Sequence, residues 1–406
     1  MTDAISRGQR ILFLTELFPY PPAVAGDAVY GRGVIETWAS VADITVLCAE
    51  SGADRNLGHP QVTWRVVGPQ RTGRAKSVGS RFPLIAWKSS TAHYREALAA
   101  LLQEGRWDAI VLESLGLAFA LPIVAAYRHR NPDTKLVYVS HEWEYQTRSS
   151  KYRSYGLSLP KRLAASLDLH KVRYWENLLI RSCDVVTVIN TADVNSFRVV
   201  DGSRKYLVVL PGYSGPVTAV RAVTDAVPRR VLILGGRRSE QKQQVLLDWL
   251  DVAYDYLESA GIEILVVGDI PELLRARVQS DYPSVQVLGF AEDLESVISQ
   301  ARAGLIVDTV GGGFKIRLLS HVFQRLPIIG LSEAIVGLPT PEGEGYLAAA
   351  TLADLRELVC TAVDQPALLD AVQNRAFEDC EKEFSWTDRA QALQAALGND
   401  AGSVLV

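Results

Sequence analysis

Two glycine-rich turns followed by basic residues are the segments of this sequence best suited to hold a phosphate. Gly236 and Arg237 belong to a Gly-Gly-Arg-Arg run after the apolar segment Arg230–Leu234, and Lys242 lies five residues beyond Arg237. Glycine lets the backbone approach a ligand closely, and a helix beginning here would direct its amino end at the same space. Arg237 and Lys242 could then neutralise a diphosphate from two sides; the alternative is a solvated basic turn.

The second turn has three glycines, including Gly312 and Gly313, followed by Phe314 and Lys315. It comes after a predicted strand and opens a predicted helix, so its amides and its lysine could also bind an anion. Its spacing is neither that of a P-loop nor the GxGxxG of dinucleotide-binding turns. A flexible turn without a ligand is the alternative. Two anion sites in one half of the chain favour a ligand with a diphosphate.

Acid–base groups gather in the first half of the chain. His141, Glu142 and Glu144 follow the predicted strand Lys135–Ser140, and Glu113 ends another strand. The carboxyl ends of strands are where ligands bind in parallel α/β sheets. His141 could donate to a substrate hydroxyl, and Glu142 or Glu144 could act as a base or stabilise positive charge. The alternative is a polar strand end with His141 bonded to the backbone.

Alternating strands and helices are predicted to position these residues. Apolar runs of strand length separated by helices indicate parallel sheets covered on both faces. In the first half, the predicted strands are Arg10–Glu16, Asp43–Cys48, Val62–Val67, Asp108–Glu113, Lys135–Ser140 and Asp184–Ile189. In the second half, they are Arg230–Leu234, Glu263–Val267, Val285–Leu288 and Gly304–Val307.

A Gly- and Pro-rich stretch divides the two alternations and predicts the domain organisation. We expect an N-terminal domain over residues 1–213, a linker over 214–228, a C-terminal domain over 229–383, and a last helical segment over 384–406. Both domains are predicted to be doubly wound α/β units of the Rossmann type, which face each other across a cleft.

Charge and composition narrow the function classes. The 406 residues carry a net charge of −4. Residues 1–218 have 26 basic and 19 acidic side chains, or +7, which leaves −11 for the rest. This balance argues against nucleic acid as the main partner. Basic and aromatic residues gather in two predicted loops, 71–88 and 148–162, which form either a solvated face or a contact with anionic membrane.

Several signals are missing from the sequence. No apolar run reaches the ~18 residues of a membrane span, and the first ten residues lack the apolar core of a signal peptide. We therefore expect a cytoplasmic protein, with peripheral contact at the inner face of the membrane as the alternative. The four cysteines form no CxxC pair, and no zinc-type spacing occurs. They are predicted to be reduced, and no bound metal is expected.

The order of these motifs resembles the group 1 glycosyltransferases, the glycosyltransferase family 4-like proteins of GT-B fold, over nearly the whole chain. The resemblance rests on FPYPPAVAG with Gly26, SHEWE, GGRRSEQK, the Leu-Gly-Phe ending at Phe290, GGGFKIRLLSHVFQRLPII, and Phe384-Ser385-Trp386. It implies that Gly26 lies on the acceptor side, with Glu113 as a weaker candidate there, and that Phe290 lies near the nucleoside base. It also implies a last helix that crosses back onto the first domain.

The sequence departs from this family at the second glycine turn. The family often carries two glutamates eight positions apart, where this chain has Gly312 and Ser320. Ser320 would replace the carboxylate that holds the ribose hydroxyls, and a hydroxyl makes a weaker, neutral hydrogen bond. His321 stands where a small residue is usual, and Arg325 where glycine is usual.

The resemblance implies a metal-independent hexosyltransferase without a cofactor. Its donor would be a nucleotide sugar, with UDP favoured over GDP or dTDP. The acceptor would be a glycan or a polyprenyl-pyrophosphate-linked sugar in polysaccharide or glycoconjugate synthesis. The missing glutamates motivate a second hypothesis, a catalytically inactive subunit that stabilises an active partner. A nicotinamide-dependent oxidoreductase is disfavoured because no GxGxxG occurs.

Overall fold

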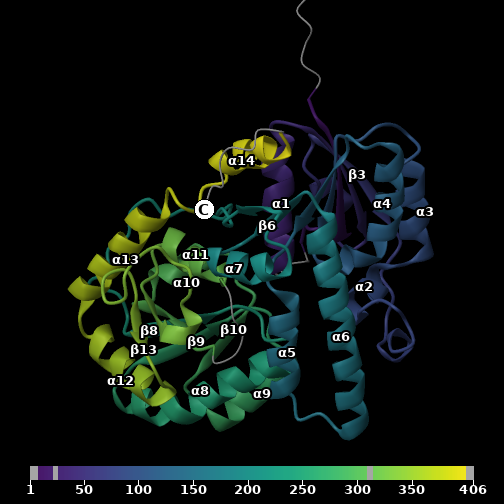
Figure 1. Cartoon of the computed structure of the whole chain (residues 1–406). Coiled ribbons are helices and arrows are strands. Elements are labelled where there is room, and N and C mark those ends of the chain that lie inside the picture. Colours follow the sequence, from purple (N-terminus) through teal and green to yellow (C-terminus); the bar gives the residue numbers. More distant parts are fainter. Residues whose placement is uncertain (1–7, 22–25, 309–313, 399–406) are drawn as a thin grey trace, which may run out of the picture. The chain divides into compact units, whose positions relative to one another are not determined.

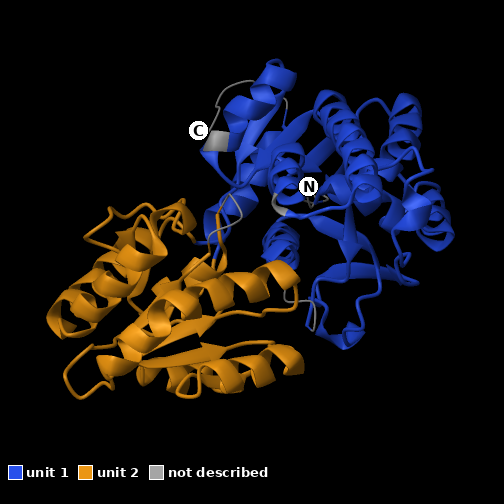
Figure 2. Ribbon diagram, turned by 90° about the horizontal axis from the view of Figure 1, so that it is seen from below, with its two compact units in different colours: residues 1–212, 385–406 blue, residues 213–384 orange. Residues whose placement is uncertain are grey.

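The chain forms two compact units, each built on one parallel sheet. The computed structural model describes residues 8–21, 26–308 and 314–398 (Figure 1). Unit 1 comprises residues 1–212 and 385–406, and unit 2 comprises residues 213–384 (Figure 2). The predicted α/β class with two Rossmann-like domains is confirmed.

The sheet of unit 1 has seven strands in the order β3-β2-β1-β4-β5-β6-β7, and all neighbouring pairs are parallel. Helices cover it because its strands are apolar on both faces; β4, for example, is buried along its whole length. The strands are β1 (Arg10–Leu17), β2 (Asp43–Ala49), β3 (Val62–Val67), β4 (Ala109–Glu113), β5 (Lys135–Val139), β6 (Val185–Val188) and β7 (Lys205–Val208). The helices are α1 (Gly26–Ala39), α2 (Leu84–Ser89), α3 (Ala92–Leu101), α4 (Leu121–Arg130), α5 (Glu144–Ser154), α6 (Leu159–Ser182), α7 (Thr191–Val200) and α14 (Thr387–Leu397).

The last helix, α14, returns to unit 1, as expected. Trp386 fills space that two glycines leave open, because a Cβ atom on Gly33 or Gly212 would lie 2.0 or 2.4 Å from its ring. Thr37 Oγ1 donates to the Trp386 carbonyl at 3.0 Å, and Lys205 Nζ donates to the Ala396 carbonyl at 3.1 Å. Packing and hydrogen bonds therefore hold α14 on unit 1.

Unit 2 repeats this plan with six parallel strands in the order β10-β9-β8-β11-β12-β13. The strands are β8 (Arg230–Leu234), β9 (Glu263–Val267), β10 (Gln286–Gly289), β11 (Ala303–Ile306), β12 (Ile328–Leu331) and β13 (Leu347–Ala349). The helices are α8 (Glu240–Ser259), α9 (Glu272–Asp281), α10 (Leu294–Ser299), α11 (Arg317–Phe323), α12 (Leu352–Val363) and α13 (Pro366–Cys380).

Strand order decides where each unit can bind a ligand. The order reverses between β1 and β4 in unit 1 and between β8 and β11 in unit 2. Open α/β sheets bind ligands at the carboxyl ends of the strands beside such a reversal. The residues that follow these four strands are therefore the first candidates for a site.

Gly26, which the resemblance places on the acceptor side, opens helix α1. Two expected loops were wrong. Residues 71–88 include α2, a short helix that buries Ala86 and Trp87, and residues 148–162 lie mostly on α5 and the start of α6. A six-residue helix gives too few turns for a periodic pattern, and α5 is polar along most of its length.

Candidate active site

A buried pair joins the ends of β4 and β5 in unit 1. His141 Nε2 lies 3.2 Å from Glu113 Oε1, and the Glu113 side chain is 4% exposed. Gly31 of α1 leaves room for this carboxylate, because a Cβ atom there would lie 2.0 Å from Oε1. The ring of Tyr30 meets the imidazole edge-to-face, with 5.3 Å between centroids. Two residues selected from the sequence, His141 and Glu113, are thus brought together.

The charge of His141 follows from this environment. Burial disfavours the imidazolium form, but the hydrogen bond and the negative charge of Glu113 outweigh it. The pKa of His141 therefore rises from 6.5 to about 8. His141 is then mostly protonated at neutral pH and can donate a hydrogen bond or a proton to a substrate oxygen.

A second carboxylate, Glu16 at the end of β1, was not selected from the sequence. Its Oε1 accepts a hydrogen bond from Ser114 Oγ at 2.5 Å, and its Oε2 accepts from Ser89 Oγ at 3.2 Å and from Gln70 Nε2 at 3.5 Å. Ser114 adopts a φ of 70°, which is uncommon for a residue other than glycine. Gly116 makes room, since a Cβ atom there would lie 2.1 Å from the carboxyl carbon.

The titration of Glu16 gives a testable dependence of stability on pH. Burial raises its pKa from 4.5 to about 7, while the hydrogen bond from Ser114 opposes the shift. Between these values the folded chain holds a proton that the unfolded chain has released, so Glu16 makes the free energy of unfolding fall as pH rises. Glu16→Gln lacks this titration. We expect it to gain about 3 kcal/mol relative to wild type between pH 4.5 and 7.5.

Urea unfolding across this pH range checks the prediction. Glu104→Gln, at an exposed carboxylate 4.0 Å from Arg65, is the matched control and should follow the wild-type profile. Parallel profiles for Glu16→Gln and wild type would mean that Glu16 ionises normally in the fold.

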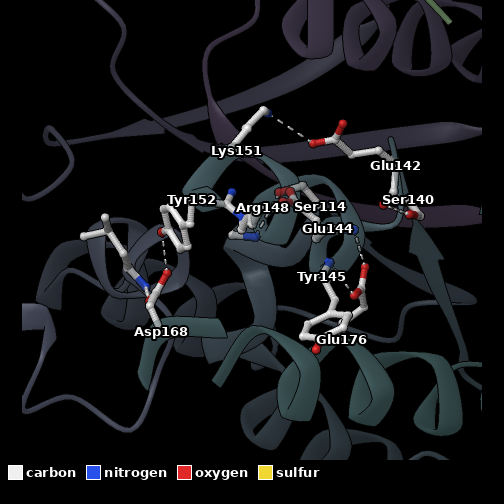
Figure 3. A network of polar contacts seen from close by, with 12 residues as sticks. Ser114, Ser140, Glu142, Glu144, Tyr145, Arg148, Lys151, Tyr152, Asp168 and Glu176 are labelled. Carbon is white, nitrogen blue, oxygen red and sulfur yellow. Dashed lines mark hydrogen bonds and ion pairs between the residues drawn. The ribbon is translucent and has the colours of Figure 1, made fainter. Parts of the chain in front are cut away.

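The two glutamates that follow His141 are held by basic side chains (Figure 3). Glu144 Oε2 accepts from Arg148 Nε at 2.6 Å, one turn along α5. Glu142 Oε1 lies 3.7 Å from Lys151 Nζ, and burial raises the pKa of Glu142. Both glutamates are therefore paired with basic side chains of α5, whereas Glu113 is the carboxylate that contacts the imidazole of His141.

Glu176 of α6 supports this arrangement from below α5. It is fully buried, and its carboxylate accepts the backbone N–H groups of Glu144 and Tyr145 at 2.8 and 3.1 Å (Figure 3). Two of the free amides at the amino end of α5 are thereby satisfied. Burial and the nearby charge of Glu144 raise the pKa of Glu176 to about 8, although the two amide hydrogen bonds lower it.

In unit 2 the turn after β8 carries a buried arginine. Gly235 adopts a φ of 109°, which an L-residue rarely adopts. The backbone N–H of Arg237 donates to the Asp269 carbonyl at 2.8 Å and ties the turn to the end of β9. The Arg237 side chain is 2% exposed, and its Nη1 donates to the carbonyls of Gly235 and Gly236 at 3.2 and 3.4 Å.

A second arginine that sequence reasoning missed lies beside it. A Cβ atom on Gly235 would be 3.7 Å from Arg237 Nη1 and 3.8 Å from Arg317 Nη1. Arg317 begins α11 and pairs with Asp308, which follows β11. Burial lowers the pKa of both arginines to about 10, and the charge of Arg237 adds to the lowering at Arg317. Among residues that the structure describes, neither Nε atom has a hydrogen-bond partner.

Such a pair can bind an anion. Two desolvated positive charges oppose each other, and an anion between them would relieve that repulsion and accept the unused N–H groups. The pair lies where β8 and β11 meet, at the reversal of strand order. Oriented guanidinium groups in a buried setting match the oxygens of a phosphate particularly well.

The other residues selected for the donor diphosphate have different surroundings. Lys242 lies exposed in the first turn of α8. Lys315 Nζ donates to the Ala334 carbonyl at 3.1 Å, and burial lowers its pKa. Phe314 stacks on Phe384 with 5.2 Å between ring centroids, so its side chain contributes to packing. Gly312 and Gly313 lie outside the described residues.

The two residues selected for the nucleoside differ in exposure. Phe290 follows β10 and is 79% exposed, so its ring is available to stack on a base. Ser320 is half-buried in α11, and hydrogen bonds with Ser320 and Gln324 lower the pKa of Tyr213 against the effect of burial. His321 fits because Gly304 has no Cβ, and its Nδ1 lies 2.9 Å from the Arg317 carbonyl oxygen.

Residues 8–21, 26–308 and 314–398 contain neither a candidate metal-ligand cluster nor a candidate membrane-spanning helix. No group of three or more His, Cys, Asp or Glu side chains in this part of the chain is placed to hold a metal ion. No helix there is both long and apolar enough to cross a bilayer.

Comparison with known proteins identifies the fold. No sequence family and no curated protein matches the chain. Sucrose-phosphate synthase of Thermosynechococcus elongatus is 16% identical, with a TM-score of 0.68 over 95% of this chain and 97% of its own. HepE of Anabaena, solved with UDP and glucose, is 15% identical, with a TM-score of 0.63 over 96% of this chain and 99% of its own.

WaaG, a glycosyltransferase involved in lipopolysaccharide biosynthesis, is 13% identical, with a TM-score of 0.61 over 97% of this chain and 100% of its own. The chain has the GT-B fold. The predicted architecture is therefore confirmed over nearly its full length, including the return of α14 to the first unit. Within this GT-B fold, the two clusters described above lie at the strand-order reversals of the two sheets.

Proposed function

We propose that the protein is a glycosyltransferase that moves a hexose from a nucleotide diphosphate sugar to a glycan or lipid-linked acceptor. The observation that carries this proposal is the buried pair Arg237 and Arg317, with unused N–H groups at the reversal point of the second sheet. A leaving diphosphate gains negative charge as the sugar departs, and fixed cations stabilise that charge. Because the protein supplies these cations, the proposed transfer is metal-independent.

The first unit is proposed to bind the acceptor. His141, protonated through Glu113, would donate to a sugar oxygen, and Glu16 with Ser114 would receive acceptor hydroxyls beside it. These groups end β1, β4 and β5 and share one edge of the sheet. UDP is the favoured donor nucleotide, and the structure of HepE, which has the same fold, contains UDP and glucose.

Nucleotide binding tests the proposal directly. Isothermal calorimetry of the full chain with UDP, GDP, dTDP and their glucose conjugates, with and without magnesium, should give selective binding of the uridine compounds. UDP at 100 times its dissociation constant should also stabilise the fold by ~2.7 kcal/mol. Selective binding of GDP would change the donor class.

A non-catalytic subunit is the second candidate. Ser320 favours it, because it stands where the resemblance implies a glutamate for the ribose hydroxyls. If folded protein binds none of the nucleotides, this candidate replaces the first.

A further inference from the structure

Helix α6 carries an apolar face that the fold leaves uncovered. Leu159, Leu163, Leu167 and Tyr174 are 73%, 73%, 44% and 61% exposed. At 3.6 residues per turn these four positions lie within ~80° of one another around the helix. We call them the leucine face. Val172, Trp175 and Leu179 lie on the opposite side and are buried in the unit 1 core.

A neighbouring segment extends the leucine face. Lys171 Nζ donates to the carbonyls of Ser77 and Val78 at 3.1 and 2.8 Å, which holds residues 74–80 beside α6 (Figure 1). Val78 is itself 45% exposed. An exposed apolar side chain from a segment far away in sequence is therefore held beside α6.

Basic side chains dominate around this surface. Residues 71–88 contain five basic and no acidic side chains, and residues 145–182 contain eight basic and two acidic ones. Both acids are engaged within the fold. Glu176 is fully buried, and Asp168 accepts hydrogen bonds from the Leu84 amide and from Tyr152 at 2.7 and 2.9 Å. Arg162 and Arg173 are exposed and lie along one side of the leucine face.

We propose that the leucine face of α6 rests on a bilayer that carries anionic lipid. Leucine and tyrosine side chains would enter the boundary between headgroups and acyl chains, while the flanking arginines and lysines would meet the lipid phosphates. Each basic residue near such a surface strengthens binding roughly fivefold. A protein partner with an apolar patch would also cover the leucines, but it would not explain why exposed acids are missing across two segments.

Vesicle flotation of the full chain tests this. The protein should float with phosphatidylcholine vesicles that contain phosphatidylglycerol, should not float with phosphatidylcholine alone, and should dissociate as salt rises. The double variant Leu159→Ser/Leu163→Ser should bind at least tenfold more weakly. Leu273→Ser/Val220→Ser, at positions 88% and 86% exposed in unit 2, is the matched control and should bind like wild type.

All four substitutions lie on the surface, so circular dichroism should report an unchanged fold. The assay contains no nucleotide, so its result does not depend on the proposed transferase activity. Failure of the wild type to float with anionic vesicles would overturn the proposal, as would equal binding by the leucine variant. If instead sedimentation detects self-association that the leucine variant loses, the leucine face is a contact between copies and the lipid proposal is wrong.

Discussion

Arg237→Met should lose at least about 100-fold in affinity for UDP and at the same time become more stable without ligand. The guanidinium would make two charge-assisted hydrogen bonds to the diphosphate, each worth roughly 1.5–3 kcal/mol. In the unliganded fold the same group has an unused Nε atom and a pKa lowered to about 10 by burial. Replacing it by an apolar side chain of similar size removes that desolvation cost, for a gain of about 1–2 kcal/mol.

Two further variants isolate the effect. Arg238→Met removes a neighbouring arginine whose side chain is 82% exposed and pairs with Asp269, and it should change neither property appreciably. Arg317→Met should also lose UDP affinity, but it should destabilise the fold, because it leaves the carboxylate of Asp308 without its arginine. Calorimetry and urea unfolding measure both quantities. Retained UDP affinity in Arg237→Met would remove the main support for the donor site.

Local sequence predicted ten of the thirteen strands that the structure describes and missed β7, β12 and β13. Strands such as β4 and β8 are continuous apolar runs, and the Gly-Gly turn after β8 pointed to Arg237. Arg317 gave no such signal, because its importance comes from the pairing of β11 with β8, which brings two turns far apart in sequence together. Strand order is a tertiary property, so the second half of the anion site could not be found by spacing.

Other residues were missed for different reasons. Glu16 ends a buried strand as Glu113 does, so the same signal was present in the sequence and was not used. Glu176 lies in the middle of a 24-residue helix, where no local feature distinguishes a buried carboxylate from a solvated one. The leucines of α6 have the spacing of a buried helix face, but the opposite face of the helix packs against the core. Periodicity shows that a helix has an apolar face, and it does not show whether that face is covered.

Arg325 illustrates how a departure from the family can be accommodated. It stands where the resemblance implies glycine, and its φ of 52° lies in the left-handed region that glycine favours. Its side chain donates to the Thr218 carbonyl at 3.0 Å and to Asn374 at 2.6 Å, and it lies 3.9 Å from the centre of the Phe377 ring. These contacts offset backbone strain of about 1–3 kcal/mol.

Glu113→Gln should reduce transfer at pH 7 by about 100-fold with little loss of donor affinity. Glutamine keeps the shape that fits against Gly31, but it removes the negative charge that holds the proton on His141. Burial then acts alone, and the pKa of His141 should fall from about 8 to below its usual 6.5. His141 would be mostly neutral at pH 7 and would lose the charge-assisted hydrogen bond proposed to hold a sugar oxygen, which is worth roughly 1.5–3 kcal/mol.

The pH dependence separates this role from a purely structural one. Wild-type transfer should decline as pH rises through about 8, whereas in Glu113→Gln the decline should begin more than one pH unit lower. NMR titration of the His141 ring should show the same displacement. Glu104→Gln is the control for loss of a surface carboxylate and should leave both profiles unchanged.

The free energy of unfolding should fall with rising pH over the same range as transfer does. The folded chain holds a proton on His141 at pH values where the unfolded chain has lost it, so this pair stabilises the fold fully below about pH 6.5 and ceases to do so as pH rises through about 8. The pair should therefore contribute about 2 kcal/mol at pH 6 that Glu113→Gln lacks.

If Glu142→Gln loses transfer while Glu113→Gln retains it, transfer depends on the Glu142 carboxylate, and Glu113 serves only to pack against α1.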